Sequence, residues 1–276
     1  MKTNFKLAVC QMKVEEDKKQ NITKALEMIK KSAKNKSDMV ILPEMFNCPY
    51  DNSKFAEYAE TKDNSNTLNA ISNAAKKYGV YIIAGSIPEL NNEKIYNSSF
   101  TFDKNGEIIG IYRKIHLFDI DIPNKITFKE SDVLTAGNKI TVIKTDFCKI
   151  GIGICYDIRF PEILRLMTLK GAELIVIPGA FNMITGPAHW ETLIRSRAID
   201  NQVYVVAASP AQNKNLSYVG YGNSMIVEPW GNILARANSK EEIIYSEIDL
   251  SYINEIREEL PLLKNIRNDI YEIREK

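Results

Sequence analysis

A cysteine, a glutamate and a lysine each follow a predicted strand, and together these groups could carry out nucleophilic chemistry. Residues 149–162, KIGIGICYDIRFPE, predict a buried strand, a sharp turn and, from Pro161, a helix. Cys155 lies between strand and helix, where a helix N-terminus could lower the thiol pKa and favour a reactive thiolate. The competing interpretation is a small apolar core residue, as most free cysteines are, and Cys155 taken alone favours it.

The glutamate and the lysine offer the two further groups that an activated thiol needs. Glu44 ends the apolar run MVILP and Lys114 closes IIGIYRK, where α/β proteins usually place functional side chains. Glu44 could accept the thiol proton, and Lys114, with the backbone N–H of Tyr156, could stabilise an oxyanion. Taken singly, Glu44 and Lys114 are better explained as a buried structural ion pair or as solvated strand ends.

Histidine and metal chemistry are the alternatives. The chain has two histidines, so counts alone leave a Cys–His hydrolase open. His116, two residues after Lys114, is the better candidate for its base, whereas His189 is typical of the first turn of a helix. The cysteines and histidines are too scattered for a metal-ligand cluster. The run GIGICY has Tyr156 in place of the third glycine of a dinucleotide-binding loop.

The composition is ordinary for a soluble globular protein. Lys and Arg number 36 against 35 Asp and Glu, so the net charge gives no case for nucleic acid or an anionic membrane. No apolar run approaches the roughly 20 residues of a membrane span, and MKTNFKLAVC has no signal-peptide pattern. Because Cys10, Cys48, Cys148 and Cys155 lack CxxC spacing, we expect a reduced, cytoplasmic protein without disulfides or structural zinc.

Predicted strands and helices alternate along the chain without a linker, which indicates one α/β domain over residues 1–276. Apolar runs such as MVIL and LIVI are typical of sheets covered on both faces. The segment 116–139 has no clear period, and loops of that length are usually functional or disordered. The other predicted elements are helices over 19–34, 64–78 (ended by Gly79), 161–170 and 186–202, strands over 4–10, 80–87, 173–181, 203–210 and 243–250, and hairpins over 98–115 and 223–237.

Three separated segments closely resemble the signatures of the nitrilase, or carbon–nitrogen hydrolase, superfamily. They are LPEMF around Glu44, YRKIHLFD around Lys114 and GICYDIRFPE around Cys155. Four further segments resemble the omega-amidase (2-oxoglutaramate amidase) branch of this superfamily in particular. They are KIHLFDIDIPNKITFKES, PGAFNMITGPAHWE, AIDNQVYVVAASPA and the VEPWG hairpin. The resemblance implies an α-β-β-α four-layer sandwich in which helices flank two mixed sheets. It also implies a homodimer with the tail 251–276 at the interface.

The resemblance further implies roles for individual residues. Glu44, Lys114 and Cys155 would form a catalytic triad, and Glu130, otherwise only a charged loop residue, would help to hold the site. The implied reaction hydrolyses the terminal amide of 2-oxoglutaramate or 2-oxosuccinamate to the 2-oxo-diacid and ammonia through a thioester. It requires no metal or cofactor, and the partner is a small-molecule amide rather than nucleic acid or a membrane.

The far carboxylate of such a substrate needs a cation, ideally the guanidinium fork of arginine. Arg159, one turn after Cys155, is placed to face the same cavity. The structural alternative for Arg159 is an ion pair with Asp157 or Glu162, and we favour the substrate-binding role.

Three more residues complete the expected substrate site. Thr185 and Tyr50 match positions that resemble substrate contacts in the branch, and Phe181 could form an apolar wall. Tyr50 and Phe181 could equally be core residues. The chain departs from many relatives by reading GYGNS where they have a histidine, so Asn223 bears on specificity rather than on activity.

Other functions of the same fold are the competing hypotheses. A deaminated-glutathione amidase would share the triad and the ITGPAHW segment, but its loop after the lysine looks different. An N-carbamoyl amidase or a true nitrilase resembles the chain less. A non-catalytic scaffold on the same fold is the remote alternative, and the presence of all four active-site residues argues against it.

Overall fold

The computed structural model of the chain describes residues 4–123 and 126–276. The expectation of no signal peptide rests on the first ten residues, and residues 1–3 of these lie outside the described residues. Residues 124–125, within the segment 116–139, lie outside them too. In the described ranges, no helix is both long and apolar enough to cross a membrane. All four cysteines fall within these ranges, and each is buried and free.

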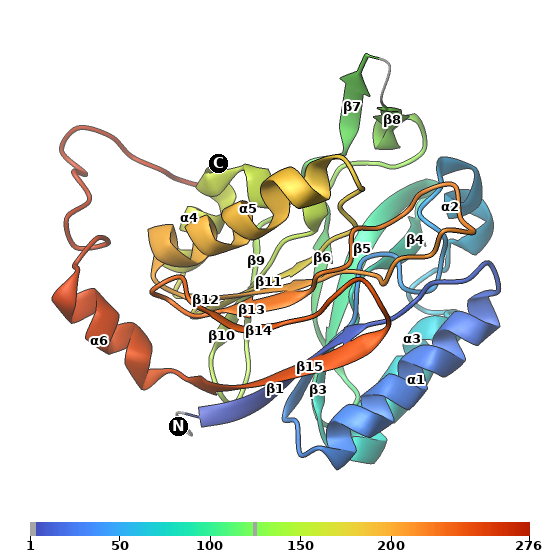
Figure 1. Cartoon of the computed structure of the whole chain (residues 1–276), viewed down its shortest axis with the longest axis horizontal. Helices are drawn as coiled ribbons and strands as arrows, with labels where there is room; N and C mark the ends of the chain where they lie inside the picture. The colour runs from blue at the N-terminus through green and yellow to red at the C-terminus, as the bar shows by residue number, and fades with distance from the viewer. Residues whose placement is uncertain (1–3, 124–125) are drawn as a thin grey trace.

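Two sheets form the centre of the molecule (Figure 1). The first contains β1 (Asn4–Gln11), β2 (Met39–Ile41), β3 (Tyr81–Ile83), β4 (Ile87–Asn91), β5 (Lys94–Phe102), β6 (Ile108–Arg113) and β15 (Glu242–Asp249). The second contains β9 (Thr141–Lys144), β10 (Lys149–Ile152), β11 (Leu174–Pro178), β12 (Tyr204–Ala208), β13 (Met225–Val227) and β14 (Ile233–Arg236). A separate hairpin pairs β7 (Asp119–Ile122) with β8 (Ile126–Lys129).

Both sheets combine a parallel centre with antiparallel edges. The order in the first sheet is β15-β1-β2-β3-β5-β4, with β6 paired to β5, and β1, β2 and β3 run parallel. The order in the second is β14-β13-β12-β11-β10-β9, and β10, β11 and β12 run parallel. The prediction of two mixed sheets is therefore confirmed.

Helices cover the outer face of each sheet and complete four layers (Figure 1). Helices α1 (Lys18–Lys34) and α3 (Asn66–Tyr78) cover the first sheet, and α4 (Pro161–Leu169) and α5 (Thr185–Asn201) cover the second. The shorter helices are α2 (Asn52–Tyr58), α6 (Ser251–Glu259) and the 3₁₀ turns η1 (Glu130–Asp132) and η2 (Cys155–Arg159). The predicted α-β-β-α sandwich is thus confirmed.

The alternation of apolar residues explains why the first sheet lies between two layers. In β1, Leu7 and Val9 pack into the core between the sheets, whereas Ala8 and Cys10 pack against the helices. The same alternation continues in β2, where Ile41 joins the core between the sheets. Since both faces are covered, these strands carry the near-continuous apolar runs seen in the sequence.

The C-terminal tail begins with α6 at the edge of the layers, where Ile253 and Ile256 are buried. Helix α6 follows β15, and the chain after it returns toward α4 (Figure 1). There Glu275 forms an ion pair with Lys170 and accepts a hydrogen bond from the backbone N–H of Ile140 at 3.3 Å. The tail is therefore anchored at its end by charged and backbone contacts.

Several elements differ from the sequence predictions. The strand predicted over 80–87 is divided into β3 and β4, because the chain turns at Gly85, whose φ is +40°. The hairpin between β4 and β5 was not predicted, since its turn residues Asn92 and Glu93 adopt positive φ without a glycine. Helix α2 was not predicted either, and the aperiodic segment 116–139 contains the β7–β8 hairpin and η1.

Substitution of Gly85 tests the close packing of the turn after β3 against the backbone of Pro43, the residue before Glu44. A Cβ atom at Gly85 would lie 1.9 Å from the carbonyl oxygen of Pro43, and the left-handed backbone adds strain. We expect Gly85→Ala to lower the free energy of unfolding by about 3–5 kcal/mol, through overpacking and backbone strain together. Urea denaturation measures this change.

The matched control is Gly79→Ala at the end of α3. Gly79 has a φ of +63°, but a Cβ there would meet no atom within 4 Å. The strain alone should cost about 1–2 kcal/mol. Equal losses at the two positions would contradict the packing argument for Gly85.

Candidate active site

A buried lysine lies between two buried glutamates where strands of the first sheet and the β7–β8 hairpin end. The Nζ atom of Lys114 lies 3.2 Å from Oε1 of Glu44 and 2.8 Å from Oε2 of Glu130, and all three side chains are 0% exposed. Glu44 follows β2, Lys114 follows β6 and Glu130 begins η1 directly after β8. The structure therefore brings together three residues that are 70 and 16 positions apart in the chain.

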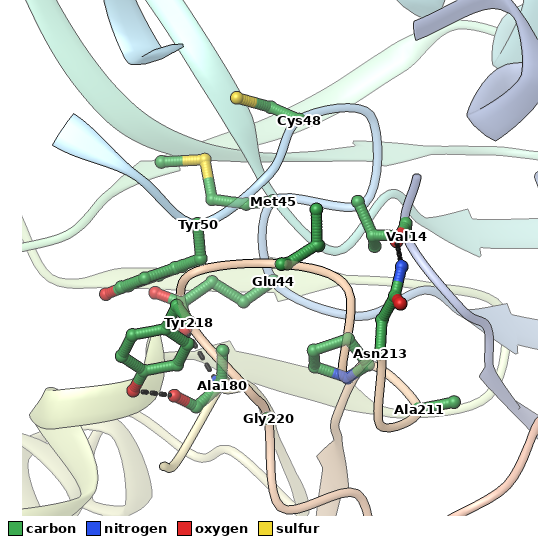
Figure 2. A pocket seen from close by; sticks show the side chains of 12 residues that line it. Val14, Glu44, Met45, Cys48, Tyr50, Ala180, Ala211, Asn213, Tyr218 and Gly220 are labelled. Carbon is green, nitrogen blue, oxygen red and sulfur yellow. Dashed lines mark hydrogen bonds between the residues drawn. The ribbon is translucent and has the colours of Figure 1, made fainter. Parts of the chain in front are cut away.

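The carboxylate of Glu44 is surrounded by hydrogen-bond donors. Its Oε1 accepts from Lys114 Nζ and, at 2.8 Å, from Asn97 Nδ2, while its Oε2 accepts from the backbone N–H of Ala180 at 2.7 Å. Glu44 also shares a side-chain hydrogen bond with Cys155. Figure 2 shows Glu44 and Ala180 side by side at the cavity. The four contacts hold the carboxyl group in one orientation toward the thiol.

Burial and charge set the protonation of the cluster. Burial raises the pKa of Glu44, Lys114 opposes this, and the neighbouring Glu130 raises it further. Burial alone would disfavour the Lys114 ammonium, but attraction to Glu130 and Glu44 outweighs it and raises the pKa of Lys114. Lys114 is therefore always charged, and Glu44 is a stronger base than an exposed glutamate.

Cys155 is the first residue of η2, and its backbone has a φ of +49°. A left-handed backbone is unusual for a residue with a Cβ, and functional sites often contain one. The thiol is buried, and burial together with the charge of Glu44 raises its pKa well above the ordinary value. The expectation of a lowered thiol pKa is therefore wrong, because a single 3₁₀ turn does not offset burial beside two carboxylates.

Glu130 connects the lysine to the surrounding loops. Its Oε1 accepts from the Tyr50 hydroxyl at 2.5 Å and from Lys114, and its Oε2 accepts from the backbone N–H of Phe118 at 2.6 Å. The Tyr50 hydroxyl also lies 3.3 Å from Lys114 Nζ. Tyr50 thus belongs to the polar cluster through its hydroxyl and is buried. Its role as a substrate contact stays a prediction.

A cavity opens beside Glu44, and two tyrosines line it (Figure 2). The rings of Tyr50 and Tyr218 lie 4.7 Å apart, and the Tyr218 hydroxyl donates to the carbonyl of Ala180 at 2.5 Å. The lining residues are Val14, Glu44, Met45, Cys48, Tyr50, Ala180, Pro210, Ala211, Asn213, Leu216, Tyr218 and Gly220. Tyr218 comes from a loop that the sequence analysis did not connect with the site.

Arg159 is held by aromatic rings rather than by a carboxylate. Its guanidinium carbon lies 4.8 Å from the ring centre of Phe181 and 5.7 Å from that of Tyr156. One guanidinium nitrogen lies 3.2 Å from Nδ1 of His189. In the ranges that the structure describes, Arg159 forms no ion pair, so the alternative pairing with Asp157 or with a glutamate of α4 is not formed.

Thr185 begins α5, and Phe181 lies in the segment between β11 and α5. The Thr185 hydroxyl donates to Oδ1 of Asn182 at 3.1 Å, and the backbone N–H of Thr185 donates to the same oxygen at 2.8 Å. Asn182 therefore holds the turn that leads into α5, and Thr185 does not line the cavity beside Glu44. Phe181 is buried and packs on Trp190 with ring centres 4.8 Å apart, so it is part of the core. Its role as an apolar wall of the substrate site stays a prediction.

The two histidines do not support a Cys–His pair. His116 Nδ1 lies 2.8 Å from Oδ1 of Asp157, and its ring stacks on Phe160 at 3.6 Å. His189 lies beside Arg159 and is exposed. Among the described side chains, neither histidine hydrogen-bonds to Cys155, whereas Glu44 does.

Asn223 occupies a strained position behind the site. Its φ is +59°, a conformation that asparagine tolerates better than most residues. Its carbonyl accepts from Trp190 Nε1 at 2.7 Å, and its side chain contacts Tyr221 and Arg236. Asn223 is therefore connected to Phe181 both through Trp190 and through Tyr221, whose backbone N–H donates to the Phe181 carbonyl at 2.7 Å. Its effect on specificity stays a prediction.

The groups that sequence reasoning missed are Asn97, Tyr218 and the backbone N–H of Ala180. Asn97 lies on β5, which is separated from β2 by β3, and its side chain reaches Glu44, a contact that only the order of the strands in the sheet reveals. The residue type at position 180 does not indicate that its backbone N–H donates a hydrogen bond to Glu44, because every residue except proline has such a donor. For Tyr218 the only available signal was its place in an irregular, tyrosine-containing loop.

Comparisons with known proteins agree with this geometry. The family model for carbon-nitrogen hydrolase matches residues 6–258. The chain is 48% identical over 272 residues to Omega-amidase NIT2 from Xenopus tropicalis, covering 99% of this chain and 98% of the relative. It is 46% identical over 274 residues to Omega-amidase NIT2 from Homo sapiens, covering 99% of each.

A solved structure is similar over the same extent. The crystal structure of Saccharomyces cerevisiae Nit3, a member of branch 10 of the nitrilase superfamily, matches with a TM-score of 0.89 and 42% identity. The match covers 96% of this chain and 97% of that one. The sequence motifs, the four-layer fold and these relatives lead to one conclusion: the chain belongs to the carbon–nitrogen hydrolase family.

Proposed function

We propose that this chain is a cysteine-dependent omega-amidase. It hydrolyses the terminal amide of 2-oxo-acid omega-amides, such as 2-oxoglutaramate and 2-oxosuccinamate, to the 2-oxo-diacid and ammonia. The observation that carries the proposal is the buried Lys114 between Glu44 and Glu130, with Glu44 hydrogen-bonded to the Cys155 thiol. Two relatives that match over nearly their whole length bear the name omega-amidase.

The first half of the reaction forms a thioester. Glu44 takes the proton of Cys155, and the thiolate attacks the amide carbon. Lys114 and the backbone N–H of Tyr156 stabilise the oxyanion; in the described part of the chain this N–H donates to no acceptor. Glu44 then gives its proton to the departing nitrogen, so the C–N bond breaks, ammonia leaves and the acyl group stays on sulfur.

The second half returns the enzyme to its starting state. Glu44 accepts a proton from water as the water oxygen attacks the thioester carbon. The C–S bond breaks, the carboxylic acid leaves, and the proton returns to the Cys155 sulfur. Glu130 takes part by holding Lys114 and Tyr50 in place, because its Oε1 accepts a hydrogen bond from each of them. None of these steps needs a metal ion or a cofactor.

The substrate end of the site is built around Arg159. Its charge has no carboxylate partner in the described residues, and the rings of Phe181 and Tyr156 orient it. A substrate carboxylate would form the bidentate pair that arginine favours. Phe181 supplies an apolar wall of the substrate site. Tyr50 and Thr185 are further proposed substrate contacts. Tyr50 would contact the substrate with its ring, and Thr185 with a free lone pair of its hydroxyl oxygen.

The assembly and the location stay predictions. We propose a single domain over residues 1–276 that forms a homodimer in the cytoplasm, with the tail 251–276 at the interface. Large apolar side chains are exposed on α4, at the end of α5 and in the tail, among them Leu169, Ile199 and Leu260 at 51%, 40% and 43%. Such side chains are typical of surfaces that a partner covers.

Release of ammonia from 2-oxoglutaramate tests the function, with Cys155→Ala as the decisive variant. We expect turnover by the wild type and a loss of about 10³-fold or more in the variant, because no other nucleophile is available. Cys148→Ala is the matched control, because Cys148 is also a buried free cysteine and lies just before β10, at the opposite end of this strand from Cys155. The control should keep its activity within about twofold.

Absence of wild-type turnover would reject the substrate assignment but not the fold. Deaminated glutathione and N-carbamoyl amino acids would then be the next substrates to test. Hydrolysis of either compound faster than that of 2-oxoglutaramate would replace the omega-amidase assignment. Inactivity on every small amide, with tight binding to a protein, would favour the non-catalytic scaffold.

Arg159→Lys tests the carboxylate-binding role. Lysine keeps the charge but loses the bidentate geometry, so kcat/KM for 2-oxoglutaramate should fall about tenfold or more. For butyramide, which has no carboxylate, it should change less than about threefold. Arg195→Lys, on the exposed side of α5, is the control. Equal losses for both substrates would show that Arg159 supports the fold rather than the carboxylate.

The pH dependence of Cys155 alkylation tests the raised thiol pKa. In the wild type, the rate with iodoacetamide should keep rising above pH 8, because burial and Glu44 disfavour the thiolate. Glu44→Gln removes the negative charge, so the thiol pKa falls and the rise should move to lower pH, while amide turnover is lost. Mass spectrometry of the Cys155 peptide follows the reaction. A wild-type rate already at its plateau at pH 6 would contradict this prediction.

A further inference from the structure

Asp157 is a buried carboxylate that the proposed chemistry does not use. It lies two residues after Cys155, and it is 0% exposed. Burying an ionised carboxylate is unfavourable unless donors surround it. Among the described residues, no lysine or arginine pairs with Asp157, so its stabilisation depends on hydrogen bonds from neutral donors and from His116.

Four donors converge on this carboxylate, two on each oxygen. Oδ2 accepts from the backbone N–H of Ile154 at 2.8 Å and from the Tyr112 hydroxyl at 2.7 Å. Oδ1 accepts from the backbone N–H of His116 at 3.0 Å and lies 2.8 Å from its Nδ1. Burial, followed by the charge of Asp157, raises the pKa of Tyr112 well above its ordinary value, so its hydroxyl remains a donor.

The positions of the donors connect the nucleophile to the lysine. Ile154 immediately precedes Cys155, and Tyr112 and His116 lie two residues before and two after Lys114. A single side chain therefore joins the turn after β10, in one sheet, to the end of β6, in the other. The separation of the Cys155 sulfur from Lys114 depends on this link.

His116 extends the link to the far end of the nucleophile turn. Its ring stacks on Phe160 with centres 3.6 Å apart and planes 7° apart. Phe160 ends η2, and its backbone N–H donates to the Asp157 carbonyl at 3.0 Å. The turn is thus held at both ends, which is what a cysteine with positive φ needs to keep its conformation.

We propose that Asp157 is a positioning residue: with Tyr112 and His116 it fixes the strained turn of Cys155 relative to Lys114. The proposal rests on the proposed function for its kinetic readout. Asparagine cannot replace Asp157, because each oxygen faces a backbone N–H and one of them would meet the amide NH₂. A displacement of about 1 Å in a reacting group can lower the rate about 100-fold.

The test compares Asp157→Asn and Tyr112→Phe with the matched control Tyr204→Phe. Tyr204 is also buried, and its hydroxyl donates to the Asp249 carbonyl at 2.8 Å, away from the site. We expect kcat for 2-oxoglutaramate to fall about tenfold in Tyr112→Phe and more in Asp157→Asn, with KM changed less than about threefold. Tyr204→Phe should lower the melting temperature similarly and leave kcat within twofold.

A second readout separates this proposal from the proposed function. Displacing Cys155 from the cluster weakens the effect of Glu44 and Glu130, which raise the thiol pKa, and that of Lys114, which lowers it; the effect of Glu44 is the larger, so the pKa should fall. Iodoacetamide alkylation should therefore rise at lower pH in Tyr112→Phe and not in Tyr204→Phe. This holds even if the wild type does not hydrolyse 2-oxoglutaramate. If Asp157→Asn does not fold, Tyr112→Phe decides alone. An unshifted alkylation profile in a folded Tyr112→Phe would overturn the proposal, as would an unchanged kcat.

Discussion

The burial of Lys114 between Glu44 and Glu130 is the constraint on which the rest of the site depends. A buried ion pair is stable only when the remaining lone pairs and protons are satisfied, because desolvation opposes it. Here Asn97, the Ala180 backbone and Cys155 complete the shell of Glu44, and Tyr50 and the Phe118 backbone complete that of Glu130. The donors come from both sheets and the hairpin base, so the four-layer packing must be formed before the cluster is stable.

The charge of this cluster explains why the thiol needs an internal base. Two carboxylates and one ammonium give a net charge of −1, so loss of the Cys155 proton to solvent would place a second negative charge in a buried site. Transfer of the proton to Glu44 leaves the net charge of the cluster unchanged, because the negative charge moves from Glu44 to the sulfur of Cys155, next to Lys114. The high thiol pKa and the raised pKa of Glu44 are therefore consequences of one arrangement. The high thiol pKa disfavours loss of the proton to solvent, and the raised pKa of Glu44 makes this carboxylate the better acceptor.

The sequence predicted what local pattern determines. Alternation in β1 and β2, the helical spacing in α1 and α3, and reactive residues at strand ends needed no tertiary information. The direction of the Cys155 pKa shift was wrong, because it depends on burial and on Glu44, 111 positions away. Asn97 and the Ala180 N–H were missed for the same reason, since their roles exist only once the strands are paired. Hairpin β7–β8 was missed because its strands are short and mostly exposed.

Lys114 and Arg159, the two cations of the proposed site, differ in their electrostatic surroundings, and we propose that this difference orients the substrate. The charge of Lys114 is already balanced by two carboxylates, so a third carboxylate brought near it would be repelled by Glu44 and Glu130. In the described part of the chain Arg159 has no such balance, and its partners are aromatic faces. In the proposed function, a substrate that carries an amide at one end and a carboxylate at the other would therefore bind with the carboxylate at Arg159. Its neutral amide is then left for the Lys114 end, where a negative charge develops only in the transition state and displaces no existing ion pair.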